Sequence, residues 1–291
     1  MVNLGGVARG ARLVNGATML KLAPLAIFIV AGAGAVHSVN FMQTVAPTTG
    51  GLGRALILAL FAFTGMETSL SASGEVAQPA RTIPRALAMA MLIVTLLYVA
   101  VQIIAQGILG ASLQNSTVPL ADAMARISPA LRALMLAGAA LSMFGWIGGS
   151  LLGTPRMLFA FARDGYLPSV LGRVHPRSHI PHVAILCFAA LAIGLALTGT
   201  FAELAVLATL GSAALYIAGC AAAWKLARRG VARAGVPLNF RWLRAAMLIG
   251  IAGMLFLIAL ASRAEIIGLL AVLTGSAAVF LVSKRSSRGG R

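Results

Sequence analysis

The chain has 291 residues, of which 60% are hydrophobic and 10% are charged, and its mean hydropathy is +0.95. A soluble domain usually carries about 25% charged residues, so this much apolar surface cannot be hidden inside one water-soluble globule. A bilayer removes the difficulty because lipid replaces water around the apolar faces. The net charge of +17 does not indicate a nucleic acid partner, since the basic residues stand in short blocks between long apolar runs.

Long apolar stretches follow one another along the whole chain. A membrane-spanning helix needs about 20 mostly apolar residues, and eight stretches meet that need. They predict an all-α membrane protein with a single polytopic domain over residues 1–291. The predicted spans are 17–36, 54–73, 86–110, 131–152, 183–200, 204–225, 245–262 and 266–283. The longer connections are 74–85, 153–182 and 226–244, and a basic tail covers 284–291.

The lysines and arginines predict the orientation of these spans. An even number of spans puts both termini on one side, and that side is cytoplasmic if it holds the basic excess. With cytoplasmic termini, the inner segments hold nineteen of the 23 basic residues. The outer segments hold the other four, which are Arg54, Arg126, Arg132 and Arg263. We therefore expect a multi-pass plasma membrane protein with the three long connections inside. The alanine- and arginine-rich composition favours a bacterial inner membrane.

The second predicted span contains polar residues past its middle, among them Gly65 and Glu67. A carboxylate at that depth is costly in lipid, so it needs a partner or a cavity. If the helix unwinds over 62–66, the freed carbonyls can hold an ammonium and the new helix start favours an anion, a combination that suits an amino acid. A continuous helix, with a glycine-mediated contact and Glu67 bonded to a neighbour, explains the composition equally well.

Two other predicted spans carry polar residues of interest. Lys21 lies a few residues inside its span, where it could snorkel to the cytoplasmic surface. It could instead be a buried ammonium that occupies a cation site or carries a proton. Ser150 follows Gly145, Gly148 and Gly149, and these small residues let another helix or a substrate come close.

Several stretches match a known family in residue type, order and spacing. The sixth helix and following loop of the amino acid–polyamine–organocation (APC) permeases resemble LFAFTGMETSLSASGEVAQPARTIPRAL. Their eighth helix and its loop resemble TPRMLFAFARDGYLPSVLGRVHPRSHIPH, and shorter matches cover the fifth and tenth helices. The resemblance implies a leucine-transporter-type fold, in which two inverted repeats each contain a broken helix. On this resemblance the first four helices are missing, and one broken helix is present.

The resemblance also implies a substrate site. It implies that the carbonyls of Phe61 and Thr64 take the substrate ammonium, and that Phe61 is also a candidate occluding aromatic. The unwound turn is completed by Ala62, Phe63 and Gly65. Ser150 falls at a position that faces the substrate side chain. The family's other broken helix would supply the turn that holds the substrate carboxylate, so half of the site is expected here.

The remaining implied roles concern coupling and gating. Lys21 resembles a lysine that stands, in some sodium-independent relatives, where other members bind sodium. We therefore expect Lys21 to take part in coupling. Structural or gating roles are expected for Glu67, Glu75, Arg163 and Asp164.

Together these features predict a permease that moves amino acids by alternating access, coupled to protons or working by exchange. The partners expected are an amino acid, the lipid bilayer and protons. Apart from Glu67, which is expected to be structural, the expected site has no acidic side chain to pair with a cationic substrate. Neutral or small amino acids are therefore favoured. The alternative is a truncated, transport-inactive fragment or a scaffold, on account of the missing helices. Catalysis is disfavoured, since Asp122 and Asp164 lie outside the spans and no Ser–His or HExxH pair lies within them.

No cofactor or metal is expected. The two cysteines, Cys187 and Cys220, lie apart in apolar runs and fit small packing residues. The histidines of the 153–182 connection have no cysteine or carboxylate nearby at ligand spacing.

Overall fold

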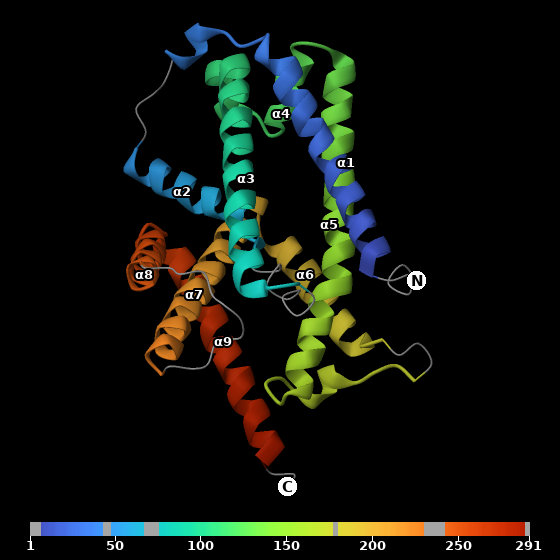
Figure 1. Cartoon of the computed structure of the whole chain (residues 1–291), viewed down its shortest axis with the longest axis vertical. Helices are drawn as coiled ribbons and strands as arrows, with labels where there is room; N and C mark the ends of the chain where they lie inside the picture. Colours follow the sequence, from blue (N-terminus) through green and yellow to red (C-terminus); the bar gives the residue numbers. More distant parts are fainter. Residues whose placement is uncertain (1–6, 43–47, 67–75, 177–179, 230–241, 289–291) are drawn as a thin grey trace. The chain divides into compact units, whose positions relative to one another are not determined.

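A computed structural model describes residues 7–42, 48–66, 76–176, 180–229 and 242–288 (Figure 1). The regular structure of these residues is helical throughout. The chain forms two compact units, which are described separately. Unit 1 comprises Met1–Ala46 and Ala90–Ser150, and unit 2 comprises Pro47–Met89 and Leu151–Arg291. Two long helices, α3 (Pro79–Leu109) and α5 (Pro129–Arg163), contribute residues to both units.

Each predicted span overlaps an apolar helix of the structure. Helical segments long and apolar enough to cross a membrane are Pro79–Asn115, Pro129–Arg163, Phe201–Arg228 and Arg263–Lys284. Shorter apolar helices cover Thr18–Ala33, Thr49–Phe63, His182–Thr198 and Leu243–Ala259. The prediction of an all-α membrane protein is confirmed.

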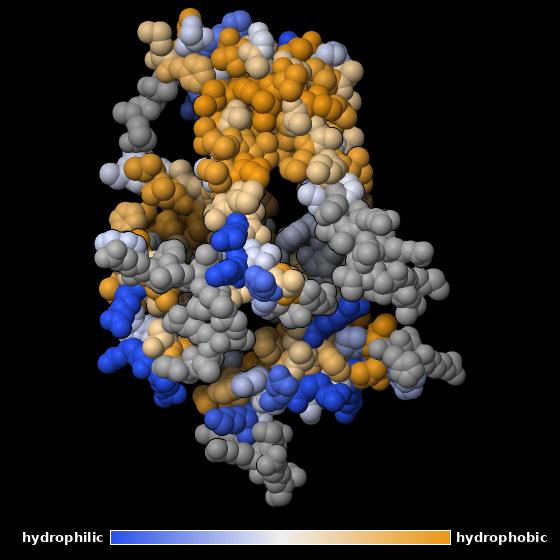
Figure 2. Space-filling model, in the orientation of Figure 1, coloured by the Kyte–Doolittle hydropathy of each residue, from blue (hydrophilic) through white to orange (hydrophobic). Residues whose placement is uncertain are grey.

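The outer surfaces of the long helices are apolar. On α3, the side chains of Leu92, Ile93 and Leu96 are each 61% exposed. Figure 2 shows a broad hydrophobic surface over the part of unit 1 that contains α3 and α5. A helix that presents apolar side chains outward as well as inward is suited to lipid, because in water each of these side chains would oppose folding.

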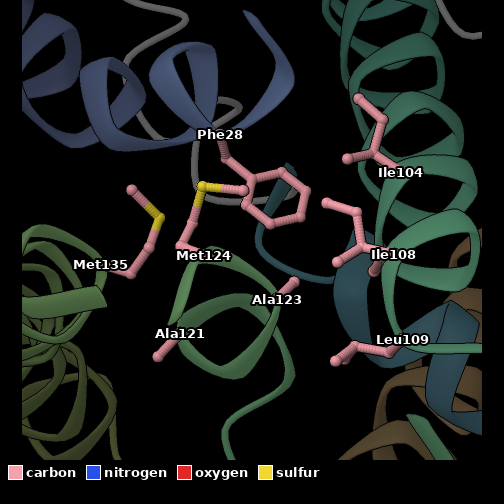
Figure 3. Packing of buried hydrophobic residues seen from close by; sticks show 9 residues of the cluster. Phe28, Ile104, Ile108, Leu109, Ala121, Ala123, Met124 and Met135 are labelled. Carbon is pink, nitrogen blue, oxygen red and sulfur yellow. The ribbon is translucent and has the colours of Figure 1, made fainter. Parts of the chain in front are cut away.

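Unit 1 packs α1 (Val7–Ala33) and the short helix α4 (Pro119–Ala125) with parts of α3 and α5. Its core contains Phe28, Ala123 and Met124, which are fully buried. Figure 3 shows the ring of Phe28 from α1 and the side chain of Met124 from α4 beside Ile108 of α3. One apolar cluster therefore joins three helices that are separated in the sequence.

The end of α3 is capped by the turn that follows α1. This turn contains η2 (Ser38–Phe41), and the side-chain amide of Asn40 donates to the carbonyls of Gly107 at 2.7 Å and Ile108 at 3.3 Å. The backbone N–H of His37 also donates to the Gly107 carbonyl, at 3.0 Å. The carbonyl of Asn40 in turn accepts from the side-chain amide of Gln106 at 3.2 Å. These bonds satisfy the last carbonyls of α3, which lack partners within the helix.

Unit 2 is built around α7 (Phe201–Arg228), which packs against α2 (Thr49–Phe63), α8 (Leu243–Ala259) and α9 (Arg263–Arg288). The helix α6 (His182–Thr198) and the turn η5 (Ser169–Gly172) complete the unit. The core residues of this unit are Ile57, Val206, Leu210 and Leu269. They come from α2, α7 and α9, so α2 is an integral part of this packing.

A glycine of α3 tests the close packing of unit 1. A Cβ atom added at Gly107 would lie 2.6 Å from a methyl carbon of Val36, whereas one at Gly194 of α6 would meet nothing within 4 Å. We expect Gly107→Ala to lower the free energy of unfolding by about 1–3 kcal/mol, because the turn after α1 must move. The matched change Gly194→Ala should instead raise it by up to about 1 kcal/mol. Thermal unfolding of both variants in detergent measures this, and equal effects would contradict it.

Candidate functional site

The helix α2 ends inside the second predicted span. Its last helical residue is Phe63, and Thr64 takes an extended conformation with φ −68° and ψ 153°. Gly65 follows with φ +106°, in the left-handed region that glycine enters without strain. The remainder of the predicted span, with Glu67, lies outside the described residues, as does Glu75. A helix end therefore lies within a run of apolar sequence.

The predicted unwinding over 62–66 begins too early. Ala62 and Phe63 are still helical, and the chain leaves the helix only at Thr64. The reason is tertiary packing, since Ile57 and Leu58 hold the preceding turns of α2 against α7 and α9. Thr64 and Gly65 form a turn, and Met66, which has 3-10 conformation, is the last residue of this segment that is described.

The carbonyl of Phe61 has two donors in this structure. The backbone N–H of Thr64 donates to it at 3.1 Å, and the Thr64 hydroxyl donates to it at 2.7 Å. A carbonyl oxygen has two lone pairs, so both are used. A substrate ammonium that binds this carbonyl must therefore displace the Thr64 hydroxyl.

The ring of Phe61 packs against α7. Its centroid lies 5.9 Å from that of Phe201, and the planes meet at 82° in an edge-to-face arrangement. Such a pair contributes about 1 kcal/mol beyond the burial of its area. The aromatic side chain expected to occlude the substrate is thus held by the first residue of α7.

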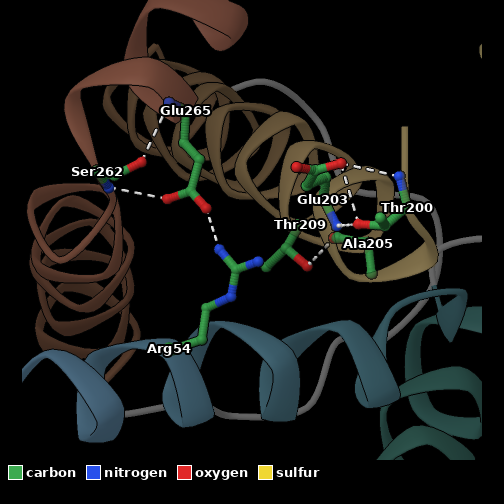
Figure 4. A network of polar contacts seen from close by, with 7 residues as sticks. All are labelled: Arg54, Thr200, Glu203, Ala205, Thr209, Ser262 and Glu265. Atoms are coloured by element: carbon green, nitrogen blue, oxygen red, sulfur yellow. Dashed lines mark hydrogen bonds and ion pairs between the residues drawn. The ribbon is translucent and has the colours of Figure 1, made fainter. Parts of the chain in front are cut away.

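Two helix starts in unit 2 carry acidic capping residues near α2 (Figure 4). At the start of α7, the Glu203 carboxylate accepts from the Thr200 N–H at 2.8 Å, and the Thr200 hydroxyl accepts from the Glu203 N–H at 3.4 Å. At the start of α9, Glu265 and Ser262 form the same reciprocal pair, at 2.8 and 3.3 Å. Arg54 of α2 forms an ion pair with Glu265. The Ser/Thr-x-x-Glu spacing is visible in the sequence and marks a helix start.

Lys21 lies on α1 in unit 1, with its side chain exposed. Its Nζ and Cε atoms are each 3.3 Å from the position that a Cβ atom on Gly145 would take. The missing side chain of Gly145 therefore gives the lysine room to lie along α5. Ser150, further along α5, is half-buried, and Cβ atoms at Gly148 and Gly149 would meet nothing within 4 Å.

The expected substrate residues are divided between the two units. Residues 61–65 belong to unit 2, whereas Lys21 and Ser150 belong to unit 1. Among the residues that the structure describes, His, Cys, Asp and Glu side chains nowhere gather in threes as a metal site requires.

Arg163 and Asp164 close the end of α5 in unit 2. The guanidinium carbon of Arg163 lies 5.8 Å from the centre of the Phe159 ring, a cation–π contact. The Asp164 N–H donates to the Ala160 carbonyl at 2.9 Å and continues the helical bonding by one residue. We predicted structural or gating roles for both residues, and these contacts show how each is held.

Aromatic contacts that the sequence analysis missed join this turn to α9. The Tyr166 ring stacks on Phe280 with centroids 6.0 Å apart, and the Ser283 hydroxyl donates to the Gly165 carbonyl at 3.4 Å. The sequence gives no local signal for this pairing, because Ser283 lies 118 positions after Gly165. The basic end of α9 thereby lies against the turn after α5.

Known proteins show extended similarity to the chain. A family model described as amino acid permease matches residues 1–285. An uncharacterized transporter of Mycobacterium tuberculosis is 34% identical over 202 residues, which is 68% of this chain and 46% of that protein. The branched-chain amino acid permease of Bacillus subtilis is 28% identical over 73% of this chain and 46% of its own length. The vacuolar cationic amino acid transporter 4 of Arabidopsis thaliana is 30% identical over 62% of this chain and 30% of its own length.

The family match extends over both units. The chain spans about half the length of the bacterial relatives, 46% in each case. The matched residues 1–285 include α1 to α8 and most of α9. They also include every stretch that resembles an APC permease, and that resemblance is confirmed. The chain belongs to the amino acid permease family.

Proposed function

We propose that this chain moves amino acids across a membrane by alternating access. The observation that carries the proposal is the end of α2, where the helix stops at Phe63 and Gly65 turns the backbone within an apolar stretch. The C-terminal end of a helix bears partial negative charge, which attracts an ammonium group. Membership of a permease family favours transport over catalysis.

The substrate ammonium is proposed to bind at the carbonyls of Phe61 and Thr64. The Thr64 hydroxyl already donates to the Phe61 carbonyl, as the ammonium would. Ala62 and Phe63 form the last helical residues before the turn that Thr64 and Gly65 make, and Ser150 is proposed to face the substrate side chain. The Phe61 ring, held by Phe201, closes over the bound substrate.

The proposed substrates are neutral amino acids with small or apolar side chains. Over 61–66, the described end of α2, the side chains are Phe, Ala, Phe, Thr, Gly and Met, and none of these is acidic. A cationic side chain would lack a counter-charge there. One of the relatives is named for branched-chain amino acids and another for cationic ones. The described residues favour the first group.

Lys21 is proposed to couple transport to protons. Its Cε and Nζ atoms lie over Gly145 of α5, and the resemblance of Lys21 to a lysine of sodium-independent relatives supports the proposed role. The proposed location is a bacterial inner membrane with both termini in the cytoplasm. The distribution of nineteen inner and four outer basic residues supports this orientation.

Uptake by the purified chain tests the proposed function directly. In liposomes with an acidic exterior, we expect saturable accumulation of labelled leucine or alanine that collapses when an ionophore removes the pH gradient. Preloading with unlabelled amino acid would separate exchange from proton coupling, since exchange needs a substrate on the far side. A chain that neither accumulates nor binds these amino acids would support the scaffold alternative.

The Thr64 hydroxyl can be tested by an isosteric change. Thr64→Val keeps the shape but removes the donor that a substrate ammonium must displace from the Phe61 carbonyl, which should lower the KM for uptake roughly fivefold, the effect of one hydrogen bond. Thr64→Ser keeps the hydroxyl and should retain the wild-type KM. Equal KM values for all three proteins would remove this carbonyl from the substrate site.

Two substitutions of Lys21 separate coupling from membrane anchoring. Lys21→Ala removes the charge, and we expect it to abolish uptake driven by a pH gradient while counterflow of labelled substrate persists. Lys21→Arg keeps a positive charge that cannot be deprotonated in a protein. Arginine would therefore restore an anchoring role but not a proton-carrying one. Normal pH-driven uptake in Lys21→Arg would contradict the coupling role.

A further inference from the structure

One face of α2 packs against the neighbouring helices of unit 2 along two turns. Arg54, Ile57, Leu58 and Phe61 recur at helical spacing, so their side chains leave the helix on the same side. Ile57 is 1% exposed and lies in the core with Val206, Leu210 and Leu269. The face therefore has a polar contact at Arg54, an apolar centre at Ile57, and an aromatic contact at Phe61.

At the polar end of this face, the carboxylate that Arg54 contacts is also held by its own helix start. One carboxylate oxygen of Glu265 accepts from the Ser262 N–H at 2.8 Å, and the other faces Arg54. The side chains of Arg54 and Glu265 are 38% and 18% exposed, so solvent screens the pair only in part. Figure 4 shows Arg54 reaching from α2 toward the start of α9.

Close backbone contact reinforces the same face. A Cβ atom on Gly53 would lie 3.3 Å from the Cβ of Leu260, at the end of α8. Gly53 is buried, and a side chain there would require Leu260 to shift by a few tenths of an ångström. Three kinds of contact, ionic, apolar and close-packed, thus hold α2 on α7, α8 and α9.

We propose that Arg54 is a positioning residue for transport. Through Glu265 it fixes α2 on α7–α9, and it thereby sets the place at which residues 61–65 meet the substrate. Arg54 touches no substrate itself, and it lies seven residues before Phe61 on the same helix face. The inference rests on the proposed function and adds to it that α2 and α7–α9 move as one body.

A double-mutant cycle measures the coupling. Arg54→Gln and Glu265→Gln each remove one charge, and glutamine at 265 still caps the start of α9. We expect each single change to raise the KM for amino acid uptake about tenfold with little change in kcat, and the double change to raise it no further. If the two residues acted independently, the two increases in KM would multiply to about a hundredfold in the double variant.

Glu203→Gln is the matched control. It makes the same substitution in the same kind of capping pair at the start of α7, but leaves the Arg54–Glu265 pair intact. Arg54 also attracts the Glu203 carboxylate, although the bonds of that carboxylate to Thr200 are stronger. The KM of Glu203→Gln should therefore rise far less than that of Glu265→Gln. If Arg54→Gln transports amino acids with the same KM as the wild type, the inference is overturned but the proposed function is not. Absence of uptake by the wild-type chain would overturn the proposed function and this inference with it.

A cross-link tests whether α2 and its neighbours move together. In a chain with Cys187 and Cys220 changed to Ser, Gly53→Cys and Leu260→Cys would place two thiols at a separation close to that of a disulfide. We expect oxidation to form the bond and leave uptake intact, because the two segments keep their spacing. Uptake that is lost on oxidation and recovered with a reductant would show that α2 moves away from α8 during transport. This result would overturn the inference.

Discussion

Inside a bilayer every backbone N–H and C=O group needs a partner within the protein. The groups at helix ends have no partner within the helix. Several polar residues of the described part of the chain lie at such ends. Asn40 supplies donors to the end of α3, and Thr64 does the same for α2. Thr200 and Ser262 supply acceptors to the starts of α7 and α9. These four side chains therefore lie where the backbone requires a partner.

This placement links structure to the proposed transport in α2. A helix that ended with all of its carbonyls satisfied by rigid backbone bonds would offer nothing to a ligand. A side-chain hydroxyl, by contrast, can rotate away and yield its place to a stronger donor. The rest of α2 is held firmly by Ile57 and Phe61, so rotation of Thr64 need not disturb the helix. Firm packing before the helix end and an exchangeable bond at that end are complementary.

Much of the fold could be predicted from the sequence because its determinants are local. Apolar length identifies the helices, and Gly65 indicates a break since few other residues reach its φ of +106°. The start of that break could not be placed at Thr64, because helix persistence through Phe63 depends on packing against α7. Partners distant in sequence were missed for the same reason. Arg54 and Glu265 lie 211 positions apart, and no local pattern pairs them.

The candidate site was predictable only to the level of residue type. Hydroxyl and glycine at 64 and 65 indicated a ligand-accepting turn, but not which group the hydroxyl would contact. The proximity of Lys21 to Gly145 likewise depends on how α1 and α5 cross. A glycine predicts that something can come close, but the sequence does not say what.

The Thr64 hydroxyl on the Phe61 carbonyl also bears on the unloaded protein. A carrier must return to its starting orientation without cargo at some point in a net transport cycle. An empty acceptor in low dielectric would penalise that return, since an unsatisfied buried carbonyl is destabilising by about 1–3 kcal/mol. A threonine that occupies the acceptor whenever the substrate has left removes the penalty. On the proposed function, Thr64 takes the place of the substrate ammonium when the site is empty, and the rate of this exchange contributes to the rate of the return step.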